Sequence, residues 1–442
     1  MTLNQTQLDS WSERLSATAR SVARSFPGER PDRQPVHTVY GGAQLFSAGS
    51  AARLGQLALA SMEQWLSGPE DFVRILGIPD VLAAAVHEKV REKLGREPVE
   101  DFRLDFEDGY GNRPDEEEDG HARSAAFEVA AGAESGSLPP FIGIRIKPLT
   151  GDLHRRSLGT LDLFLTTLAE SGSGLPEGFT VTLPKIQAPE QVVVLDEALT
   201  ELESSLGLGR IPIELMVETP QTVIDGDGTA GVRKFVEAGA GRVRGAHFGT
   251  YDYTASMNIT AAHQHMTHPA CDFARHALQV SLAGTGVWLS DGATNVMPVP
   301  LHRGDGLSDE QTAENQRSVE ETMRLHYDHI RHSLSHAYYQ GWDLHPAQLP
   351  TRYAAVYSFF LEGLEAAGER LANFVESAAK ATLVGEVFDD AATGQGLLNY
   401  FLRAMNCGAV TEEEATERTS LSVDEFRTRS FLEILNGRTA RS

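Results

Sequence analysis

Hydrophobic residues near the start of the chain recur every three or four positions. They are Leu8, Trp11, Leu15, Ala19 and Val22. This spacing places them on one face of an amphipathic helix over residues 1–25. The segment PGERPDRQP, residues 27–35, is rich in proline and charge, which is typical of a linker. We therefore expect residues 1–34 to form a helix and a linker.

Beyond this linker, short β-rich runs alternate with helix-like segments. The runs lie near residues 36–40, 101–107, 141–147, 179–186, 211–218, 243–249, 286–290 and 341–345. Such alternation predicts a parallel sheet flanked by helices. Eight strands are also the number that closes a (β/α)8 TIM barrel, and a doubly wound open sheet is the alternative. The long interval between the first two runs predicts more than one helix there.

The last part of the chain has a mainly helical pattern, as in LLNYFLRAM over residues 397–405. We expect a barrel domain over residues 35–350 and a helical C-terminal extension over residues 351–442. A barrel with insertions can reach this length as one domain.

The net charge of the chain limits the kinds of partner that we expect. Acidic residues outnumber basic ones by 62 to 38, which gives a formal net charge of −24. Such a charge repels nucleic acid and anionic membranes, so we expect a small-molecule substrate as the partner. An anionic substrate then needs a local basic pocket.

Cellular location is inferred from three features. The two cysteines, Cys271 and Cys407, are too few for a disulfide framework or a cysteine-based zinc site. The N-terminal segment lacks the apolar region of a secretory signal, and no apolar run reaches membrane-spanning length. These features predict a cytoplasmic protein.

Charged residues gather at the predicted C-terminal ends of the strands, where barrels place their catalytic groups. In chain order they are Glu107, Asp108, Arg145, Lys185, Glu218 and Asp252. Alternation along the third strand also predicts that Lys147 points to the same side as Arg145. Carboxylates and cations are thus expected to meet where a substrate would bind.

Glu218 and Asp252 follow neighbouring strands and carry hard oxygen ligands. Two such carboxylates, completed by waters and substrate oxygens, suit Mg²⁺ or Mn²⁺ better than zinc. Such a metal stabilises an enolate, and Arg145 would bind a substrate carboxylate. The alternative for each residue is a salt bridge at the barrel rim.

The same residues fall within motifs that resemble a known superfamily. The motifs are LDFEDG (104–109), RIK (145–147), LPKI (183–186), IPIELMVETP (211–220), FGTYDY (248–253) and WDLHP (342–346). Their order is similar to that of the citrate lyase β-subunit-like and HpcH/HpaI aldolases and of the malate synthases. The resemblance spans about residues 35–405 and implies a TIM-barrel lyase.

The resemblance also implies roles for individual residues. Glu218 and Asp252 match metal ligands, and Arg145 matches the arginine that binds the substrate carboxylate. Glu107 and Asp108 match acidic residues that hold metal-bound waters or order the site. Lys185, Gly249 and Thr250 fall in motifs that imply substrate binding. Relatives of this kind commonly form homo-oligomers, either trimers or hexamers.

A further motif, FDDAAT over residues 388–393, resembles the E-D-A-A-T stretch of malate synthases. There an aspartate takes a proton from the methyl group of acetyl-CoA, and Asp390 is the matching residue. The alternative is that Asp389 and Asp390 cap the helix that follows. The loop over 109–125 and the segment after Asp252 depart from the family pattern, which leaves the acceptor and the use of coenzyme A open.

Histidines are concentrated in one short segment. They are His263, His265, His268 and His276. No cysteine or carboxylate completes an obvious tetrahedral set around them, so we expect loop or subunit-contact residues rather than a second metal site. His345 is expected to be a packed histidine at a strand end.

Three functions follow. The first is a Mg²⁺-dependent carbon–carbon lyase that cleaves or forms a hydroxy-acyl thioester or a hydroxy or oxo acid through an enolate, with Asp390 as the base. The second is a class II pyruvate aldolase that acts on free oxo acids without coenzyme A. The third is a barrel that binds a partner without catalysis.

Overall fold

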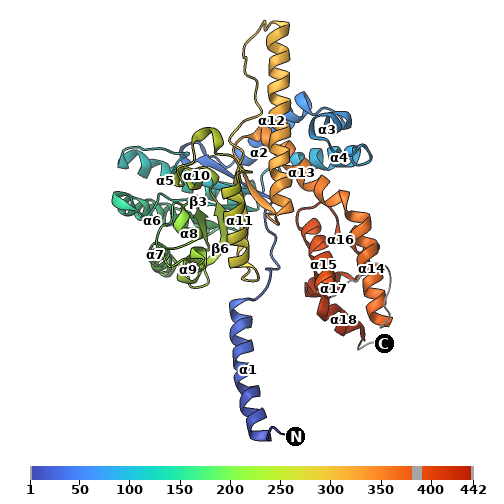
Figure 1. Ribbon diagram of the computed structural model, residues 1–442. Coiled ribbons are helices and arrows are strands. Elements are labelled where there is room, and N and C mark those ends of the chain that lie inside the picture. Colours follow the sequence, from blue (N-terminus) through green and yellow to red (C-terminus); the bar gives the residue numbers. More distant parts are fainter. Residues whose placement is uncertain (1, 381–390, 440–442) are drawn as a thin grey trace.

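Eight parallel strands close into a barrel in the order β1 to β8, which confirms the predicted (β/α)8 TIM barrel. The strands in the computed structural model, which describes residues 2–380 and 391–439 (Figure 1), are β1 (His37–Gly42), β2 (Asp101–Asp105), β3 (Phe141–Arg145), β4 (Thr180–Leu183), β5 (Ile213–Val217), β6 (Val243–Phe248), β7 (Trp288–Ala293) and β8 (Gln340–Asp343). Each predicted run overlaps one of them, although β1, β7 and β8 extend beyond their runs. Parallel strands are buried on both faces, and Ile142, Ile144 and Leu215 are accordingly inaccessible to solvent.

Helices surround the barrel and extend from it. They are α1 (Gln5–Ser25), α2 (Ser50–Trp65), α3 (Pro69–Leu76), α4 (Asp80–Arg96), α5 (Asp115–Ser135), α6 (His154–Glu170), α7 (Glu190–Leu206), α8 (Pro220–Val223), α9 (Gly231–Ala238), α10 (Thr250–Ser256), α11 (Pro269–Leu282), α12 (Asp309–Ser335), α13 (Leu349–Glu362), α14 (Leu364–Lys380), α15 (Ala391–Asn406), α16 (Glu412–Thr419), α17 (Val423–Thr428) and α18 (Phe431–Thr439). The interval between β1 and β2 holds α2, α3 and α4, as expected. None of the described helices is long and apolar enough to cross a membrane.

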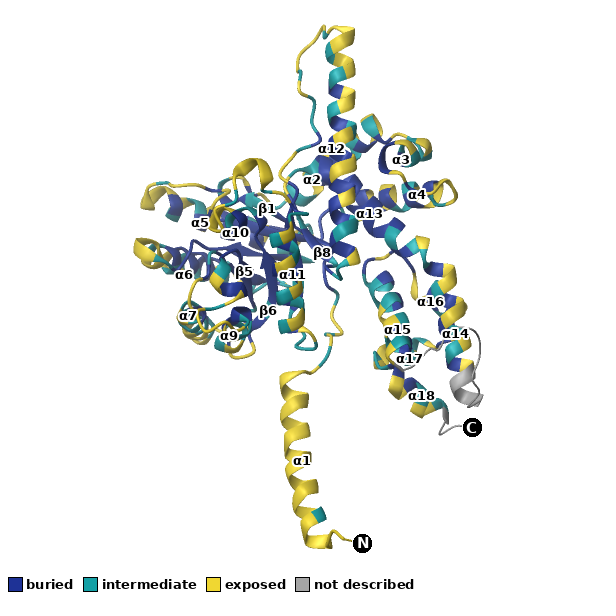
Figure 2. Ribbon diagram, viewed as in Figure 1, coloured by how far each residue is buried: buried dark blue, intermediate teal, exposed yellow. Residues whose placement is uncertain are grey.

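Two helical parts project from the barrel. Helix α1 leads away from it and buries none of its residues (Figure 2), so the apolar side chains of Trp11 and Leu15 remain 42% and 69% exposed. Helices α14 to α18 form a bundle to the right of α1 in Figure 1, and α13 joins this bundle to the barrel. The predicted N-terminal helix and C-terminal helical extension are both confirmed.

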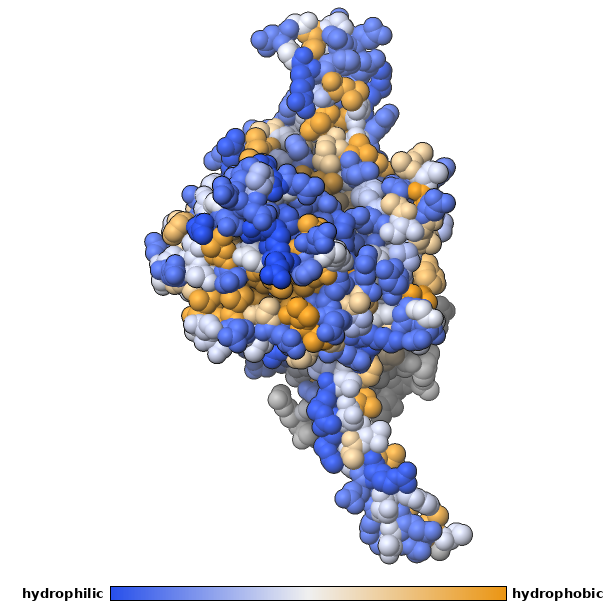
Figure 3. Space-filling view, turned by 90° about the vertical axis from the view of Figure 1, so that its left-hand side faces the viewer, coloured by the Kyte–Doolittle hydropathy of each residue, from blue (hydrophilic) through white to orange (hydrophobic). Residues whose placement is uncertain are grey.

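Figure 3 shows the face that carries α5, α6 and α7, and it is mainly hydrophilic with small apolar groups. The buried apolar side chains form a core that runs from the barrel strands through α13 into the C-terminal helices.

The linker before β1 is fastened to the C-terminal helices by Gln34. Its backbone N–H donates to the side chain of Asn406 at 2.9 Å, and Asn406 returns a 2.8 Å bond to the carbonyl oxygen of Gln34. Arg403 donates to the Gln34 side chain at 2.7 Å. The linker and helix α15 therefore meet beside the seam between β1 and β8.

A charged network crosses the barrel interior below the strand ends. Arg103 of β2 pairs with Asp101 and donates to Glu214 of β5 through Nη2 at 2.7 Å. His247 of β6 lies 3.4 Å from the same carboxylate. Burial would raise the pKa of Glu214, but the charges of Arg103 and His247 outweigh it and hold that pKa below its ordinary value. Arg103 thus faces both buried carboxylates of this network.

Candidate active site

The structure brings the predicted charged residues together at the C-terminal ends of the strands. Glu107 and Asp108 follow β2, Arg145 ends β3 and Lys185 follows β4. Glu218 follows β5 and Asp252 lies in α10, directly after β6. Because neighbouring parallel strands end at one face, six positions far apart in the sequence share this mouth of the barrel.

Lys185 is the centre of the group. Its Nζ lies 2.5 Å from Glu107 Oε1, 2.8 Å from Asp108 Oδ2 and 3.4 Å from Asp252 Oδ2. The lysine side chain is 27% exposed, so its ammonium faces the mouth. Its backbone has a φ of 48°, a left-handed conformation that is uncommon for a residue with a side chain. In this conformation its N–H donates to Glu218 Oε1 at 2.6 Å.

Glu218 is a buried carboxylate with little compensation. The close approach of Gly249 leaves room for it, since a Cβ there would lie 2.6 Å from Glu218 Oε2. Burial and the nearby charge of Asp252 raise the pKa of Glu218 to about 8, against the opposing charge of Lys185. The protein thus holds an acidic group in surroundings that disfavour its ionised form.

Arg145 is held rigidly beneath this cluster. Its Nε and Nη2 donate to Asp105 at 2.7 and 2.5 Å, and its Nη1 lies 3.2 Å from Glu107 Oε2. The guanidinium also lies over the rings of Tyr40 and Trp342, 4.8 and 5.4 Å from their centroids. The arginine therefore orients the acidic residues of β2, and its predicted contact with a substrate stays a prediction.

Lys147 does not join the cluster. Strand β3 ends at Arg145, so the alternation of side chains no longer applies two residues later. Lys147 Nζ instead lies 2.9 Å from Glu118 of α5 and donates to the carbonyl oxygen of Phe106 at 2.7 Å. It stabilises the helix layer rather than the mouth.

The residues fit a divalent cation. Asp105, Glu107, Asp108, Glu218 and Asp252 face two cations, Arg145 and Lys185. Glu107 Oε2 is buried and, besides its ion pair with Arg145, has no hydrogen-bond partner among the described residues, and burial raises the pKa of Glu107 despite both cations. An excess of hard oxygen donors is the donor set of Mg²⁺ or Mn²⁺.

Other residues predicted from the sequence make ordinary structural contacts. Thr250 is buried and its hydroxyl donates to the sulfur of Met266 at 3.1 Å. The side chain of His345 accepts from the backbone of Ala347 at 3.1 Å, as a capping residue does. Asp390 lies outside the described residues, so its role as base stays a prediction.

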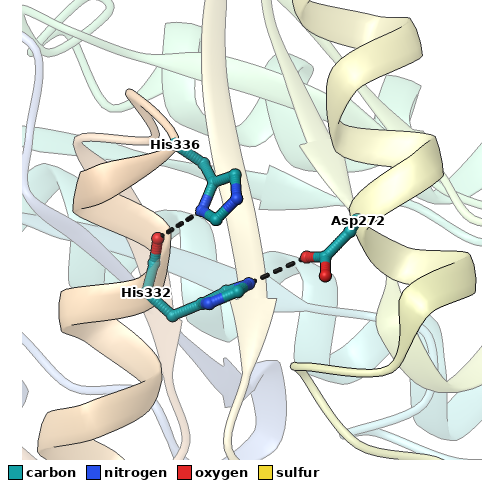
Figure 4. Close-up of side chains that lie close together, drawn as sticks. All are labelled: Asp272, His332 and His336. Carbon is teal, nitrogen blue, oxygen red and sulfur yellow. Dashed lines mark hydrogen bonds and ion pairs between the residues drawn. The ribbon is translucent and has the colours of Figure 1, made fainter.

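A second group of metal-ligating side chains lies between α11 and α12. The potential ligand atoms of Asp272, His332 and His336 all lie within 4.8 Å of one another (Figure 4). Of the histidines singled out in the sequence, His276 adjoins this group, with its ring centroid 5.2 Å from that of His336. Sequence reasoning missed His332 and His336, although their spacing of four residues was a usable signal.

Solved structures that match this chain include three enzymes. A citrate lyase from Burkholderia xenovorans LB400 has a TM-score of 0.56 and 16% identity, covering 88% of this chain and 98% of its own. A malate synthase of Haloferax volcanii, as its magnesium/glyoxylate complex, has a TM-score of 0.48 and 12% identity, covering 93% of this chain and 99% of its own. An HpcH/HpaI aldolase from Desulfitobacterium hafniense DCB-2 has a TM-score of 0.33 and 10% identity, covering 76% and 93%.

At such identities the likeness to the citrate lyase shows a shared barrel fold and no more. Among curated proteins, none matches the sequence of this chain. The model of the family described as "Domain of unknown function (DUF6986)" matches residues 15–434. Because this match spans nearly the whole chain, the protein belongs to the DUF6986 family.

Proposed function

We propose that the protein is a divalent-metal-dependent carbon–carbon lyase or aldolase in which Glu218 and Asp252 hold Mg²⁺ or Mn²⁺. The observation that carries this proposal is the unbalanced charge at the barrel mouth. Glu218 is buried beside Asp252 and its pKa is raised to about 8, and the ammonium of Lys185 contacts three carboxylates, two after β2 and one after β6. A strongly shifted carboxylate in such a position is typical of a functional site.

The substrate class follows from the same charges. A divalent ion supplies positive charge for an oxygen that becomes negative as a carbon–carbon bond breaks or forms. The substrate is then a hydroxy or oxo acid whose own oxygens complete the ligand set. Lys185, whose ammonium is the exposed cation of the cluster, attracts the carboxylate of such an acid into an otherwise negative protein.

The remaining residues position these groups. Arg145 and the backbone N–H groups of Glu107 and Gly109 hold Asp105, with the N–H bonds at 2.9 and 2.7 Å. Through Asp105 they fix the turn that presents Glu107 and Asp108 to Lys185. Asp390 is the proposed residue that moves the proton on the nucleophile, with an acyl thioester of coenzyme A as the proposed partner of the oxo acid.

Metal binding is tested by calorimetry on protein stripped with EDTA. We expect wild-type protein to bind Mg²⁺, and Glu218→Gln and Asp252→Asn each to weaken binding by at least about 100-fold, because losing even an outer partner of a metal ligand costs about 10–100-fold. Glu237→Gln is the matched control, since Glu237 pairs with Arg233 on the exposed side of α9. Equal Mg²⁺ affinity in all four proteins would remove the proposed site.

Catalysis is tested by hydrogen–deuterium exchange followed by NMR. The protein with Mg²⁺ is expected to exchange the methyl protons of pyruvate or of acetyl-CoA, and Glu218→Gln to lose this exchange. If neither compound exchanges in wild-type protein that binds Mg²⁺, enolate chemistry is excluded. Asp390→Asn tests the base: undiminished exchange of acetyl-CoA protons would rule out Asp390.

A further inference from the structure

We propose that Asp272, His332 and His336, with His276 beside them, form a second metal site that binds Zn²⁺ and links α11 to α12. This site is separate from the carboxylate cluster at the barrel mouth and does not depend on the proposed lyase function. In the described part of the chain it is the one group of three or more such side chains whose ligand atoms all lie within 4.8 Å of one another.

The geometry of the site comes from two pairs of residues, each four positions apart. Asp272 and His276 belong to α11, and His332 and His336 lie at the end of α12. Residues four apart on a helix share a face, and Figure 4 shows Asp272 of α11 and His332 of α12 pointing at each other, with His336 next to His332. His332 Nε2 lies 2.8 Å from Asp272 Oδ1, and the rings of His332 and His336 are 4.3 Å apart.

Hydrogen bonds orient the ligands as metal sites require. His336 Nδ1 donates to the carbonyl oxygen of His332 at 2.8 Å, which leaves Nε2 as the nitrogen with a lone pair. Metal-binding histidines commonly donate their other ring N–H to a carbonyl in this way. Gln279 of α11 also donates to the carbonyl oxygen of His336 at 3.1 Å, which ties the end of α12 to α11.

The local charge leaves Asp272 available to a cation. Arg275 Nη1 lies 2.6 Å from Asp272 Oδ1, but its Nε is bound to the buried carboxylate of Asp291 at 2.9 Å. One arginine therefore faces two carboxylates, which leaves one negative charge uncompensated among these three side chains. A divalent ion would supply the missing positive charge.

The donor set selects the metal. Imidazole nitrogens with one carboxylate suit Zn²⁺, which is borderline in softness and takes four ligands in a tetrahedron. The mouth of the barrel offers only carboxylates to a metal and suits Mg²⁺. The two sites are thus expected to bind different ions in the same protein.

The experiment is zinc calorimetry on stripped full-length protein in excess Mg²⁺, which saturates the mouth. We expect one equivalent of Zn²⁺ in wild-type protein and in Glu218→Gln. His332→Ala and His336→Gln should each weaken zinc binding at least tenfold, whereas His263→Ala, an exposed histidine of the preceding loop, should not change it. Zinc should also raise the Tm of wild-type protein but not of His332→Ala.

Two results would overturn the proposal. One is zinc binding with unchanged affinity in both His332→Ala and His336→Gln. The other is zinc binding that disappears in Glu218→Gln, because the ion would then belong to the barrel mouth. The failure of Mg²⁺ binding at the mouth would leave the zinc measurement intact, so the two proposals can fail separately.

Discussion

Glu214 and Glu218 come from the same strand region, four residues apart, and differ in their electrostatic surroundings. Both are 3% exposed. Glu214 faces Arg103 and His247 inside the barrel, and its pKa is below the ordinary value. Glu218 faces Asp252 at the mouth, and its pKa is raised to about 8.

Burial alone therefore does not distinguish a structural carboxylate from a functional one. The same desolvation acts on both glutamates, and the partners decide the sign of the shift. The interior network pairs its charges within the fold, whereas the mouth keeps a surplus of negative charge. This surplus of negative charge destabilises the folded protein, and a cation that binds there stabilises it again.

The largest change in the free energy of unfolding is expected when the cation of the interior network is removed. Arg103→Met leaves Asp101 and Glu214 buried without their cation, and losing one partner of a buried pair costs about 3–5 kcal/mol. We expect a loss of this size in the free energy of unfolding by urea. Arg427→Met is the control, because the Arg427–Asp424 pair is exposed and is worth less than about 1 kcal/mol. Equal losses in the two variants would contradict the contrast.

The pH dependence of stability isolates Glu218. Folded protein keeps a proton that the unfolded chain releases above its ordinary pKa of 4.5, up to about pH 8. Rising pH therefore favours unfolding in this window, by about 1.4 kcal/mol per pH unit for one proton. In EDTA, wild-type protein should lose about 2 kcal/mol relative to Glu218→Gln between about pH 6 and pH 7.5.

The control for this measurement is Glu214→Gln, which retains Glu218 and should therefore retain the same fall with rising pH. Excess Mg²⁺ should flatten the wild-type curve, because the ion takes the place of the proton. Parallel curves for wild-type protein and Glu218→Gln in EDTA would show that Glu218 has an ordinary pKa.

The smallest change in stability is expected at Lys185. Lys185→Met removes a partly exposed ammonium, which should alter the free energy of unfolding by less than about 1 kcal/mol. Mg²⁺ affinity should rise several-fold, because Lys185 contacts three carboxylates that the ion needs. Lys234→Met is the control, since Lys234 contacts Asp225 and Asp227 outside the mouth. Weaker Mg²⁺ binding in Lys185→Met would show that the lysine supports the metal site.

The barrel could be predicted because its strands are local features of the sequence. Several are short apolar runs buried on both faces, and the run at 211–218 contains β5. The predicted ends of the strands were less accurate. Strand β2 stops at Asp105, earlier than the predicted run, because its carboxylate accepts the N–H groups of Glu107 and Gly109 and turns the chain.

Contacts between distant segments could not be predicted in this way. The positive φ of Lys185, the aromatic rings above Arg145 and the turn of Lys147 toward Glu118 depend on neighbouring strands and helices. The group formed by Asp272, His332 and His336 joins positions sixty residues apart. Spacing within the histidine-rich segment therefore drew attention to His276 but not to its partners.

The fastening of Gln34 by Arg403 and Asn406 constrains the order of events during synthesis. Strand β1 forms backbone hydrogen bonds with β8. The linker before β1 is hydrogen-bonded to a helix residue 372 positions further along the chain. Closing such a long loop carries a large entropic cost before any contact repays it. A nascent chain must therefore leave one edge of β1 unpaired until β8, at residues 340–343, has emerged from the ribosome.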